Sequence, residues 1–378
     1  MSSNNKLFQP IRVGELELAH RVVLAPTTRF RADADHVPLS HVQEHYAQRA
    51  SNRGSLLVSE ATFISESAGG FPNVPGIWSD EQIAAWKKIT DTVHAHGSNI
   101  FMELWAVGRV ASAEYLASKG FPVVAPSNLP MAGRTDTPHA LSVEEIQEFV
   151  QLFATAASNA VYKAGFDGIE IGAINGYLLD QFLHDGINLR TDAYGGSPEN
   201  RARFPLEVAE AVVKAIGEKR TGYRISPWGT FNDMHFTDPS DPVPTFTYLV
   251  TELRDRYPNL AYLHVVEARS DSLATFKHTI EAVREGSNDF IREIWGARPL
   301  ISAGGYARET ALSVAEEKGD LIAFCRSYIA NPDLPYRLLH DIPLNPGIRS
   351  LYYVPGSLDP HGYNDYPFAK RVEEKRSL

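Results

Sequence analysis

The sequence predicts an α/β protein built as a single (β/α)8 barrel. Eight short apolar runs alternate with helix-patterned segments along the 378 residues. The runs are rich in Val, Ile, Leu and Tyr rather than alternating with polar residues, which is typical of parallel strands buried on both faces. Eight strand–helix units favour a closed barrel over an open doubly wound sheet, and a barrel with insertions fills this length.

The predicted strands leave room for a helix between most neighbours. In chain order they are Val22–Ala25, Leu56–Ser59, Ile100–Leu104, Gly168–Ile171, Gly222–Ser226, Tyr262–Val266, Leu300–Ala303 and Leu321–Phe324. One predicted helix begins at Ser142, which forms a capping box with Glu145 and precedes an apolar stripe. Another spans Phe204–Gly217, where the glycine ends it.

We expect one domain over residues 1–378, with three additions to the plain repeat. Leu7–Leu18 has the pattern of a β-hairpin that plugs the barrel floor. Residues 110–141 form a long excursion with Pro and Gly after the third strand. An excursion of this length is usually a lid or shapes the substrate site, although a surface insertion without a role fits the sequence equally well. Residues 345–378 form a C-terminal extension.

Composition excludes several functional classes. No run of 18 apolar residues is present, so we expect no membrane span, and the N-terminus lacks an apolar signal region. A single cysteine rules out an internal disulfide and indicates a reducing compartment. A net charge of −10 without a basic block makes nucleic acid a poor partner. We therefore expect a cytoplasmic monomer or homodimer that acts on a small molecule.

The segment after the fourth strand is the most informative part of the chain. A buried strand leads into a Gly-bracketed turn that carries Asn175 and Tyr177, and a helix follows. In parallel barrels the catalytic residues lie at the carboxyl ends of the strands. An amide and a phenol at this place indicate substrate contacts, although a tyrosine in such a turn can also serve packing alone.

This segment and the motif at Asn188–Phe204 (NLRTDAYGGSPENRARF) closely resemble the Old Yellow Enzyme family of flavin-dependent ene-reductases. The resemblance runs from Leu7 to Pro367. At residues 26–33 (PTTRFRAD) and 46–51 (YAQRAS) it is greatest to a fungal branch that includes biosynthetic members. It implies non-covalent FMN, NAD(P)H as a transient hydride donor and an α,β-unsaturated carbonyl substrate.

The resemblance also implies which residues contact the flavin. They are Pro26, Thr28, Ala61, Glu103, Arg224, Gly304, Gly305, Cys325 and Arg326. Thr28 would lie near a flavin carbonyl, and Arg224 would stabilise negative charge at flavin N1 and O2. The last four would hold the phosphate, where these barrels usually bind it. From the residues alone, the Pro26–Thr28 segment is a capped turn, and a buried Arg224 needs a partner anion, either flavin or carboxylate.

Substrate contacts are implied for Trp105, Asn175 and Tyr363, with Tyr177 as the proton donor. Three positions depart from the family pattern: Glu103 stands where Gln is usual, Gly172 where a His helps Asn175 grip the substrate carbonyl, and Cys325 where Gly is usual. A carboxyl group beside the flavin carries either a negative charge or a proton whose pKa burial raises. Glu103 could also pair with a nearby Arg and be structural.

Three functions remain open on this sequence. The first is FMN-dependent reduction of an activated C=C bond, with the carbonyl held by Asn175 and the α-carbon protonated by Tyr177. The second is a redox-neutral alkene isomerase that uses Glu103 or Tyr177 as acid and base, with the flavin non-essential. The third is a barrel that binds a ligand without turnover. No zinc-type Cys/His spacing, Ser-His-Asp order, P-loop or dinucleotide fingerprint is present, so no metal is expected.

Overall fold

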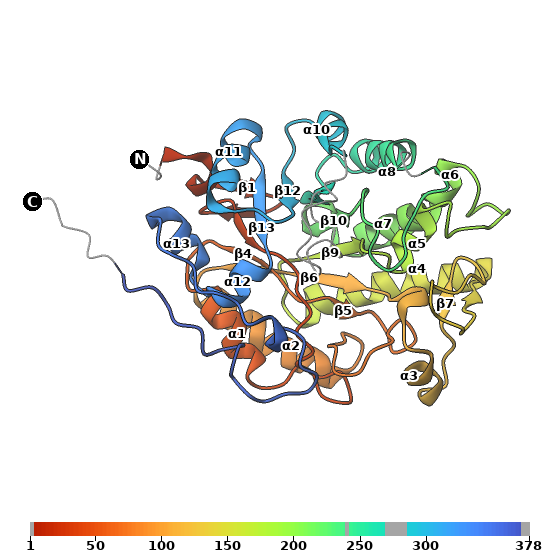
Figure 1. The fold of residues 1–378 in the computed structure, drawn as a ribbon, viewed down its shortest axis with the longest axis horizontal. Helices are drawn as coiled ribbons and strands as arrows, with labels where there is room; N and C mark the ends of the chain where they lie inside the picture. Colours follow the sequence, from red (N-terminus) through yellow and green to blue (C-terminus); the bar gives the residue numbers. More distant parts are fainter. Residues whose placement is uncertain (1–3, 239–241, 269–285, 372–378) are drawn as a thin grey trace, which may run out of the picture.

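Eight parallel strands form a closed barrel surrounded by helices, as predicted (Figure 1). The computed structural model describes residues 4–238, 242–268 and 286–371. The two ends of the expected single domain, including residues 372–378 of the expected C-terminal extension, lie outside the described residues.

The barrel strands differ from the predicted ones only at their ends. They are β3 (Val22–Leu24), β4 (Leu56–Val58), β6 (Asn99–Trp105), β9 (Gly168–Ala173), β10 (Thr221–Ile225), β11 (Tyr262–Val266), β12 (Leu300–Ala303) and β13 (Leu321–Phe324). Each pairs in parallel with the next along the chain, and β13 pairs with β3 to close the barrel. A short strand, β5 (Thr62–Phe63), pairs with the end of β6.

Helices on the outside connect successive strands. The main ones are α1 (Val42–Arg49), α2 (Asp80–Ala95), α4 (Val143–Ser158), α7 (Arg203–Ile216), α8 (Val243–Arg256), α10 (Asp289–Trp295) and α11 (Arg308–Lys318). Shorter helices are α5 (Leu178–Leu183), α6 (Pro198–Arg201), α12 (Arg326–Ala330) and α13 (Leu334–His340). The predicted capping box of Ser142 and Glu145 begins α4, and Gly217 ends α7, as expected.

An antiparallel hairpin lies ahead of the first barrel strand. Its strands are β1 (Ile11–Val13) and β2 (Leu16–Leu18). Val13 and Leu18 are fully buried in a cluster with Phe101, Tyr262 and Ile301, which point into the barrel. The hairpin therefore covers the end of the barrel opposite to the carboxyl ends of the strands.

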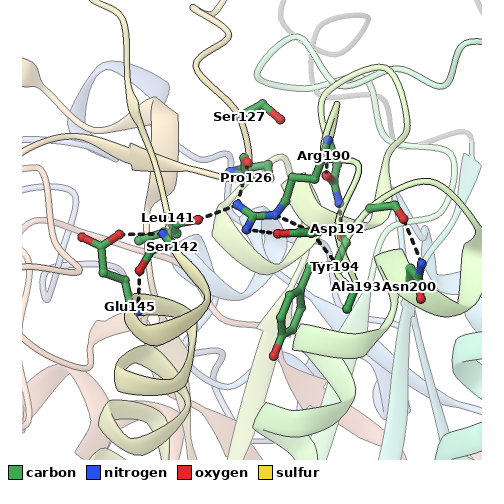
Figure 2. A network of polar contacts seen from close by, with 12 residues as sticks. Pro126, Ser127, Leu141, Ser142, Glu145, Arg190, Asp192, Ala193, Tyr194 and Asn200 are labelled. Carbon is green, nitrogen blue, oxygen red and sulfur yellow. Dashed lines mark hydrogen bonds and ion pairs between the residues drawn. The ribbon is translucent and has the colours of Figure 1, made fainter.

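The excursion after β6 contains its own short elements and is tied down by one arginine. Its elements are η3 (Gly108–Val110), α3 (Ala113–Ser118), β7 (Val124–Ala125) and β8 (His139–Ala140). As Figure 2 shows, the Arg190 guanidinium donates to the carbonyl oxygens of Pro126 (3.1 Å) and Leu141 (2.5 Å) and pairs with Asp192 at 2.6 Å. The loop after α5 thus holds the excursion in place, a structural reason for the long motif around Arg190.

The inward-facing side chains change character along the barrel. Because side chains alternate across a strand, every second residue points inward. Near the hairpin these residues are apolar or aromatic, and we call this group the lower layer: Val23, Leu56, Val58, Phe101, Tyr262, Ile301 and Leu321. Towards the carboxyl ends they are ionisable, and we call this group the upper layer: Glu103, Glu170, Arg224 and His264. The upper layer lies beneath the predicted active site.

Candidate active site

The centre of the site is an ion pair between Glu103 on β6 and Arg224 on β10. Glu103 Oε2 lies 2.6 Å from Arg224 Nη1, and the two side chains are only 6% and 9% exposed. Gly172, on the intervening strand β9, is the pairing partner of Arg224. A Cβ atom at Gly172 would lie 3.6 Å from Glu103 Cγ. Two of the three departures from the family pattern are therefore neighbours in space, and a carboxylate already partners Arg224.

A second acidic group lies directly beneath this pair. Glu170 Oε1 is 3.9 Å from Arg224 Nε, and Glu170 Oε2 is 2.8 Å from His264 Nδ1. Burial lowers the pKa of His264 well below its usual value, and Arg224 lowers it further, so the imidazole is neutral. The upper layer therefore holds two carboxyl groups and one fixed positive charge.

Burial dominates the protonation of Glu103. Its pKa is raised to about 7 because the loss of solvation outweighs the attraction of Arg224, and the charge of Glu170 raises it further. Burial also raises the pKa of Glu170. Glu103 is therefore a carboxyl group that changes its charge near neutral pH, which a glutamine at this position could not do.

The turn that carries Asn175 is held by the loop after β10. Asn175 adopts a left-handed backbone with φ of 54°, a conformation that Asn tolerates better than most residues. Its N–H donates to Ser226 Oγ at 2.9 Å, and its carbonyl oxygen accepts from Asn232 Nδ2 at 2.8 Å. At the next residue, Gly176, a Cβ atom would come within 2.6 Å of Met234 Cγ, so glycine allows the loop to approach.

Tyr177 is the N-cap residue of α5 and faces Trp105. The two rings meet edge to face, with centroids 4.6 Å apart. Burial raises the pKa of Tyr177, and a side-chain hydrogen bond with Asn232 opposes this shift. The phenol therefore remains protonated through the neutral range. Asn232 contacts both Asn175 and Tyr177. Sequence analysis did not identify it as a site residue, because no motif marks the loop in which it lies.

A row of aromatic side chains borders one side of the barrel mouth, and we call it the aromatic wall. From Tyr177 and Trp105 it continues to Phe71 (6.1 Å between centroids), Phe30 (6.5 Å) and Tyr353 (6.3 Å). Phe30 adopts a φ of 57°, which is unusual for a bulky residue and is often found at functional sites. Sequence analysis did not single out these three rings: Phe30 follows the first strand but was given no role there, and Phe71 and Tyr353 lie in loops far from a barrel strand end.

Tyr363 lies elsewhere than its expected substrate-facing position. Its side chain is fully buried, stacked on His45 with ring centroids 4.1 Å apart and covered by the Arg29 guanidinium at 4.8 Å. Packing therefore separates the ring from the mouth. Tyr353, ten residues earlier in the same extension, is 51% exposed and interacts electrostatically with Tyr177. The substrate contact of Tyr363 stays a prediction, and Tyr353 is the exposed tyrosine of the same extension.

The remaining predicted residues lie along the rim formed by β12, β13, β3 and β4. Gly304 and Gly305 follow β12, and Cys325 and Arg326 follow its neighbour β13, with Arg326 exposed. Gly305 has a φ of 63° and open space where a Cβ would stand. Pro26 and Ala61 are buried, and Thr28 is half-buried. Cys325 is half-buried and accepts a hydrogen bond from the Thr27 hydroxyl at 2.9 Å.

A model of the NADH:flavin oxidoreductase / NADH oxidase family matches residues 6–345. The chain belongs to this family. A relative named chanoclavine-I aldehyde reductase fgaOx3, from Penicillium roqueforti, is 47% identical over 374 residues and 98% of each chain. Another, named probable inactive dehydrogenase easA, from Claviceps fusiformis, is 44% identical over 100% of this chain and 98% of its own. Old Yellow Enzyme from Pichia sp. superposes with a TM-score of 0.88 and 36% identity over 100% of this chain and 97% of its own.

These matches confirm the Old Yellow Enzyme resemblance, the barrel fold and the fungal biosynthetic branch. The protein is a flavin-dependent oxidoreductase that uses FMN and a nicotinamide hydride donor. The site fits such a cofactor. Arg224 Nε and Trp105 Nε1 are buried donors without a hydrogen-bond partner among the described residues. Gly172 brings no side chain to the Glu103–Arg224 pair, and a Cβ atom there would lie 3.2 Å from the Leu104 carbonyl oxygen.

Two general features complete the description. Within residues 4–238, 242–268 and 286–371, no helix combines the length and the apolar character that crossing a membrane requires. Across the same ranges, no three His, Cys, Asp or Glu side chains come together as metal ligands could.

Proposed function

We propose that this protein reduces the C=C bond of a small α,β-unsaturated carbonyl compound, with NAD(P)H as the source of reducing equivalents. The observation that carries the proposal is the edge-to-face contact of Tyr177 with Trp105, in the same turn that carries Asn175. The loop after β10 holds this turn through Ser226 and Asn232, and Arg224 supplies a fixed positive charge from β10 itself. Bound FMN would supply the hydride for the β-carbon of the substrate.

The FMN would be held by residues from several strands. Arg224 would stabilise the negative charge of the reduced ring, and Thr28 would contact a ring carbonyl. Pro26 and Ala61 would pack against the ring, with Glu103 beneath it. The rim that carries Gly304, Gly305, Cys325 and Arg326 would hold the phosphate, which is a common arrangement after the last two strands of such barrels.

The chain's own groups account for activation and protonation of the substrate. The Asn175 amide would donate to the carbonyl oxygen and stabilise the negative charge that develops there. The Tyr177 hydroxyl would donate its proton to the α-carbon, and Asn232 would fix the direction of that hydroxyl. Because Gly172 supplies no second donor, we expect poor turnover of simple cyclic enones. Brisk reduction of such enones would show that Asn175 alone suffices.

The aromatic wall narrows the substrate class. Rings of Trp105, Phe71, Phe30 and Tyr353 favour a planar apolar body over a charged or sugar-like one. The name of the Penicillium relative, chanoclavine-I aldehyde reductase, supports an unsaturated aldehyde from fungal secondary metabolism. The partner of this site is therefore a small apolar carbonyl compound.

Redox-neutral isomerisation is the alternative, and Glu103 is the observation that favours it. A carboxyl group with a pKa of about 7 is suited to moving a proton. Against this, Glu103 is only 6% exposed and is bonded to Arg224, which limits its contact with a substrate. Reduction is therefore our primary proposal.

The decisive test is Tyr177→Phe, analysed in two half-reactions. We expect NAD(P)H to reduce the bound flavin at the wild-type rate and alkene turnover to fall by about 10²–10⁴-fold, since this is the usual contribution of general acid catalysis. Tyr363→Phe is a matched control, because it removes a phenol hydroxyl that is buried outside the wall. Equal losses in both half-reactions of Tyr177→Phe would indicate a structural role.

The alternative is tested by Glu103→Gln without nicotinamide. An isomerase would convert its substrate in the absence of NAD(P)H and lose that activity in the variant. A reductase would show no such conversion in either protein.

A further inference from the structure

We propose that Glu103 couples flavin reduction to proton uptake: it releases its hold on Arg224 and takes up one proton from solvent each time the flavin is reduced. The inference rests on the proposed flavin site above Arg224. It makes Glu103 a positioning residue that acts through Arg224, and it assigns a purpose to the two adjacent departures at Glu103 and Gly172.

The geometry of Arg224 is the first support. Its Nη1 is committed to Glu103 Oε2 at 2.6 Å, whereas its Nε is buried and has no hydrogen-bond partner among the described residues. The guanidinium thus makes a short hydrogen bond to Glu103 through Nη1, and its Nε lies 3.9 Å from Glu170 Oε1 without a hydrogen bond to it. A negative charge that develops on a bound ring would compete with Glu103 for this single cation.

The charge count is the second support. The groups that interact electrostatically with the Glu103–Arg224 pair are Glu170 on β9, Tyr262 and His264 on β11, Tyr177 at the start of α5 and Cys325 after β13. His264 is neutral and burial raises the pKa of Tyr262, so the fixed charge is that of Arg224 alone. Two ionised carboxyl groups already exceed it, and a reduced flavin adds a further negative charge. Protonation of one carboxyl group returns the sum of these charges to the value that it has with oxidised flavin.

Glu103 is a better proton acceptor than Glu170. Glu170 is held by His264 Nδ1 at 2.8 Å, and its side chain is completely buried beneath Arg224. The interaction between the two carboxyl groups raises the pKa of Glu103 and lowers that of Glu170. Glu103 is therefore the carboxyl group that takes the proton, since its pKa of about 7 is close to neutral pH.

Gly172 completes the arrangement. A Cβ atom there would lie 3.7 Å from Glu103 Cδ, so a histidine at this position would bring an imidazole donor to the carboxylate. Such a donor would keep Glu103 ionised. Glycine leaves the carboxyl group free to accept a proton.

The coupled step balances in atoms and electrons. NAD(P)H transfers a hydride, which is two electrons and one proton, to oxidised FMN and becomes NAD(P)⁺. Bound FMN would thereby gain one negative charge, and the Glu103 carboxylate would take up one proton from solvent. Two protons thus accompany two electrons, and Glu103 returns its proton when the flavin is reoxidised.

The test is the pH dependence of the flavin midpoint potential, measured on the FMN-loaded protein by spectroelectrochemistry. Above about pH 7 we expect the wild-type slope to be twice that of Glu103→Gln, because two protons rather than one accompany the two electrons. Reduction should also produce an infrared difference band of a protonated carboxyl group in the wild type, and this band should be absent from Glu103→Gln. Glutamine is the usual family residue, so the variant is expected to fold.

Glu60→Gln is the matched control. Glu60 is likewise buried with a pKa of about 7, but it accepts from the Arg29 backbone N–H at 3.2 Å and does not contact Arg224. It should keep the doubled slope and the infrared band. A single slope in the wild type, or loss of the doubled slope in Glu60→Gln but not in Glu103→Gln, would overturn the coupling. A protein that binds no FMN even after reconstitution would refute the proposed function as well.

Discussion

The lower and upper layers of the barrel interior are built on the same strands, but one buries apolar side chains and the other buries ionisable ones. In the lower layer, Phe101 and Ile301 are completely or almost completely buried among apolar neighbours and hairpin residues. In the upper layer, equally buried positions carry Glu103, Glu170 and Arg224. Burying an apolar side chain is worth about 1.5–3 kcal/mol, whereas buried charges stabilise only when they are paired.

The difference separates a region that stabilises the barrel from a region whose ionisable side chains cost stability. The lower layer would hold the barrel together with any ligand or none. The upper layer is two carboxyl groups against one guanidinium, and its lowest-energy state depends on protons and on a bound anion. The two layers should therefore respond differently to substitution, to pH and to the cofactor.

Arg224→Met should have the largest effect. It leaves Glu103 and Glu170 buried without a cation, which costs about 3–5 kcal/mol, and removes the group that we assign to the flavin ring. We expect the yellow colour to be lost or FMN affinity to fall sharply, as measured by fluorescence titration and urea unfolding. In the lower layer, Ile301→Val should cost about 0.5–1.5 kcal/mol and leave FMN affinity unchanged. Undiminished FMN affinity in Arg224→Met would contradict the assigned pose.

Gly172→His and Glu103→Gln should be non-additive, with a coupling of about 0.5–3 kcal/mol, because the two residues are in contact. In Gly172→His alone, the imidazole would hydrogen-bond to Glu103 and would not be available to a substrate. With Glu103→Gln, the imidazole should instead be available to a substrate carbonyl and raise turnover of simple cyclic enones. Steady-state rates of the two single variants and the double variant test this, and strictly additive changes in activation free energy would show that the positions act independently.

Raising the pH should lower the stability of the wild type relative to Glu103→Gln. The pKa of Glu103 rises from its ordinary value of 4.5 to about 7 on folding, so its stabilising contribution is complete below pH 4.5 and is lost as pH rises through 7. We expect the difference in the free energy of unfolding to change by up to about 3 kcal/mol across this range. Urea titrations at several pH values measure it, and the offset of Ile301→Val should stay constant. A pH-independent offset in Glu103→Gln would mean that Glu103 does not titrate there.

Most of the fold could be predicted because its signals are local. The runs at Tyr262–Val266, Leu300–Ala303 and Leu321–Phe324 match β11, β12 and β13 to the residue. The other strands gain or lose residues only where the chain turns, since strand ends depend on pairing with neighbours. The capping box at Ser142 lies within four residues of sequence, and it correctly marked the start of α4.

The site could be predicted only in part from the sequence, because its contacts join residues that are distant in the chain. The sequence required an anion beside Arg224 but left open whether flavin or carboxylate supplied it, and Glu103 lies 121 residues away. The proximity of Gly172 to Glu103 depends on strand register, which no local pattern encodes. Tyr353 and Tyr363 stand ten residues apart in the same extension, and packing against distant residues makes the first exposed and the second buried.

The aromatic wall also links function to the order in which the chain is made. Arg29 Nε donates to the carbonyl oxygen of Tyr352 at 2.8 Å across 323 residues, and the Phe30 carbonyl oxygen accepts from Gly356 N–H. The segment after the first barrel strand therefore reaches its final position only once the last part of the chain has been synthesised. Contacts of such large sequence separation form late and slowly. A ribosome-bound chain that stops before Tyr352 would hold all eight strands and still lack Tyr353 and the contacts that hold the segment of Arg29 and Phe30.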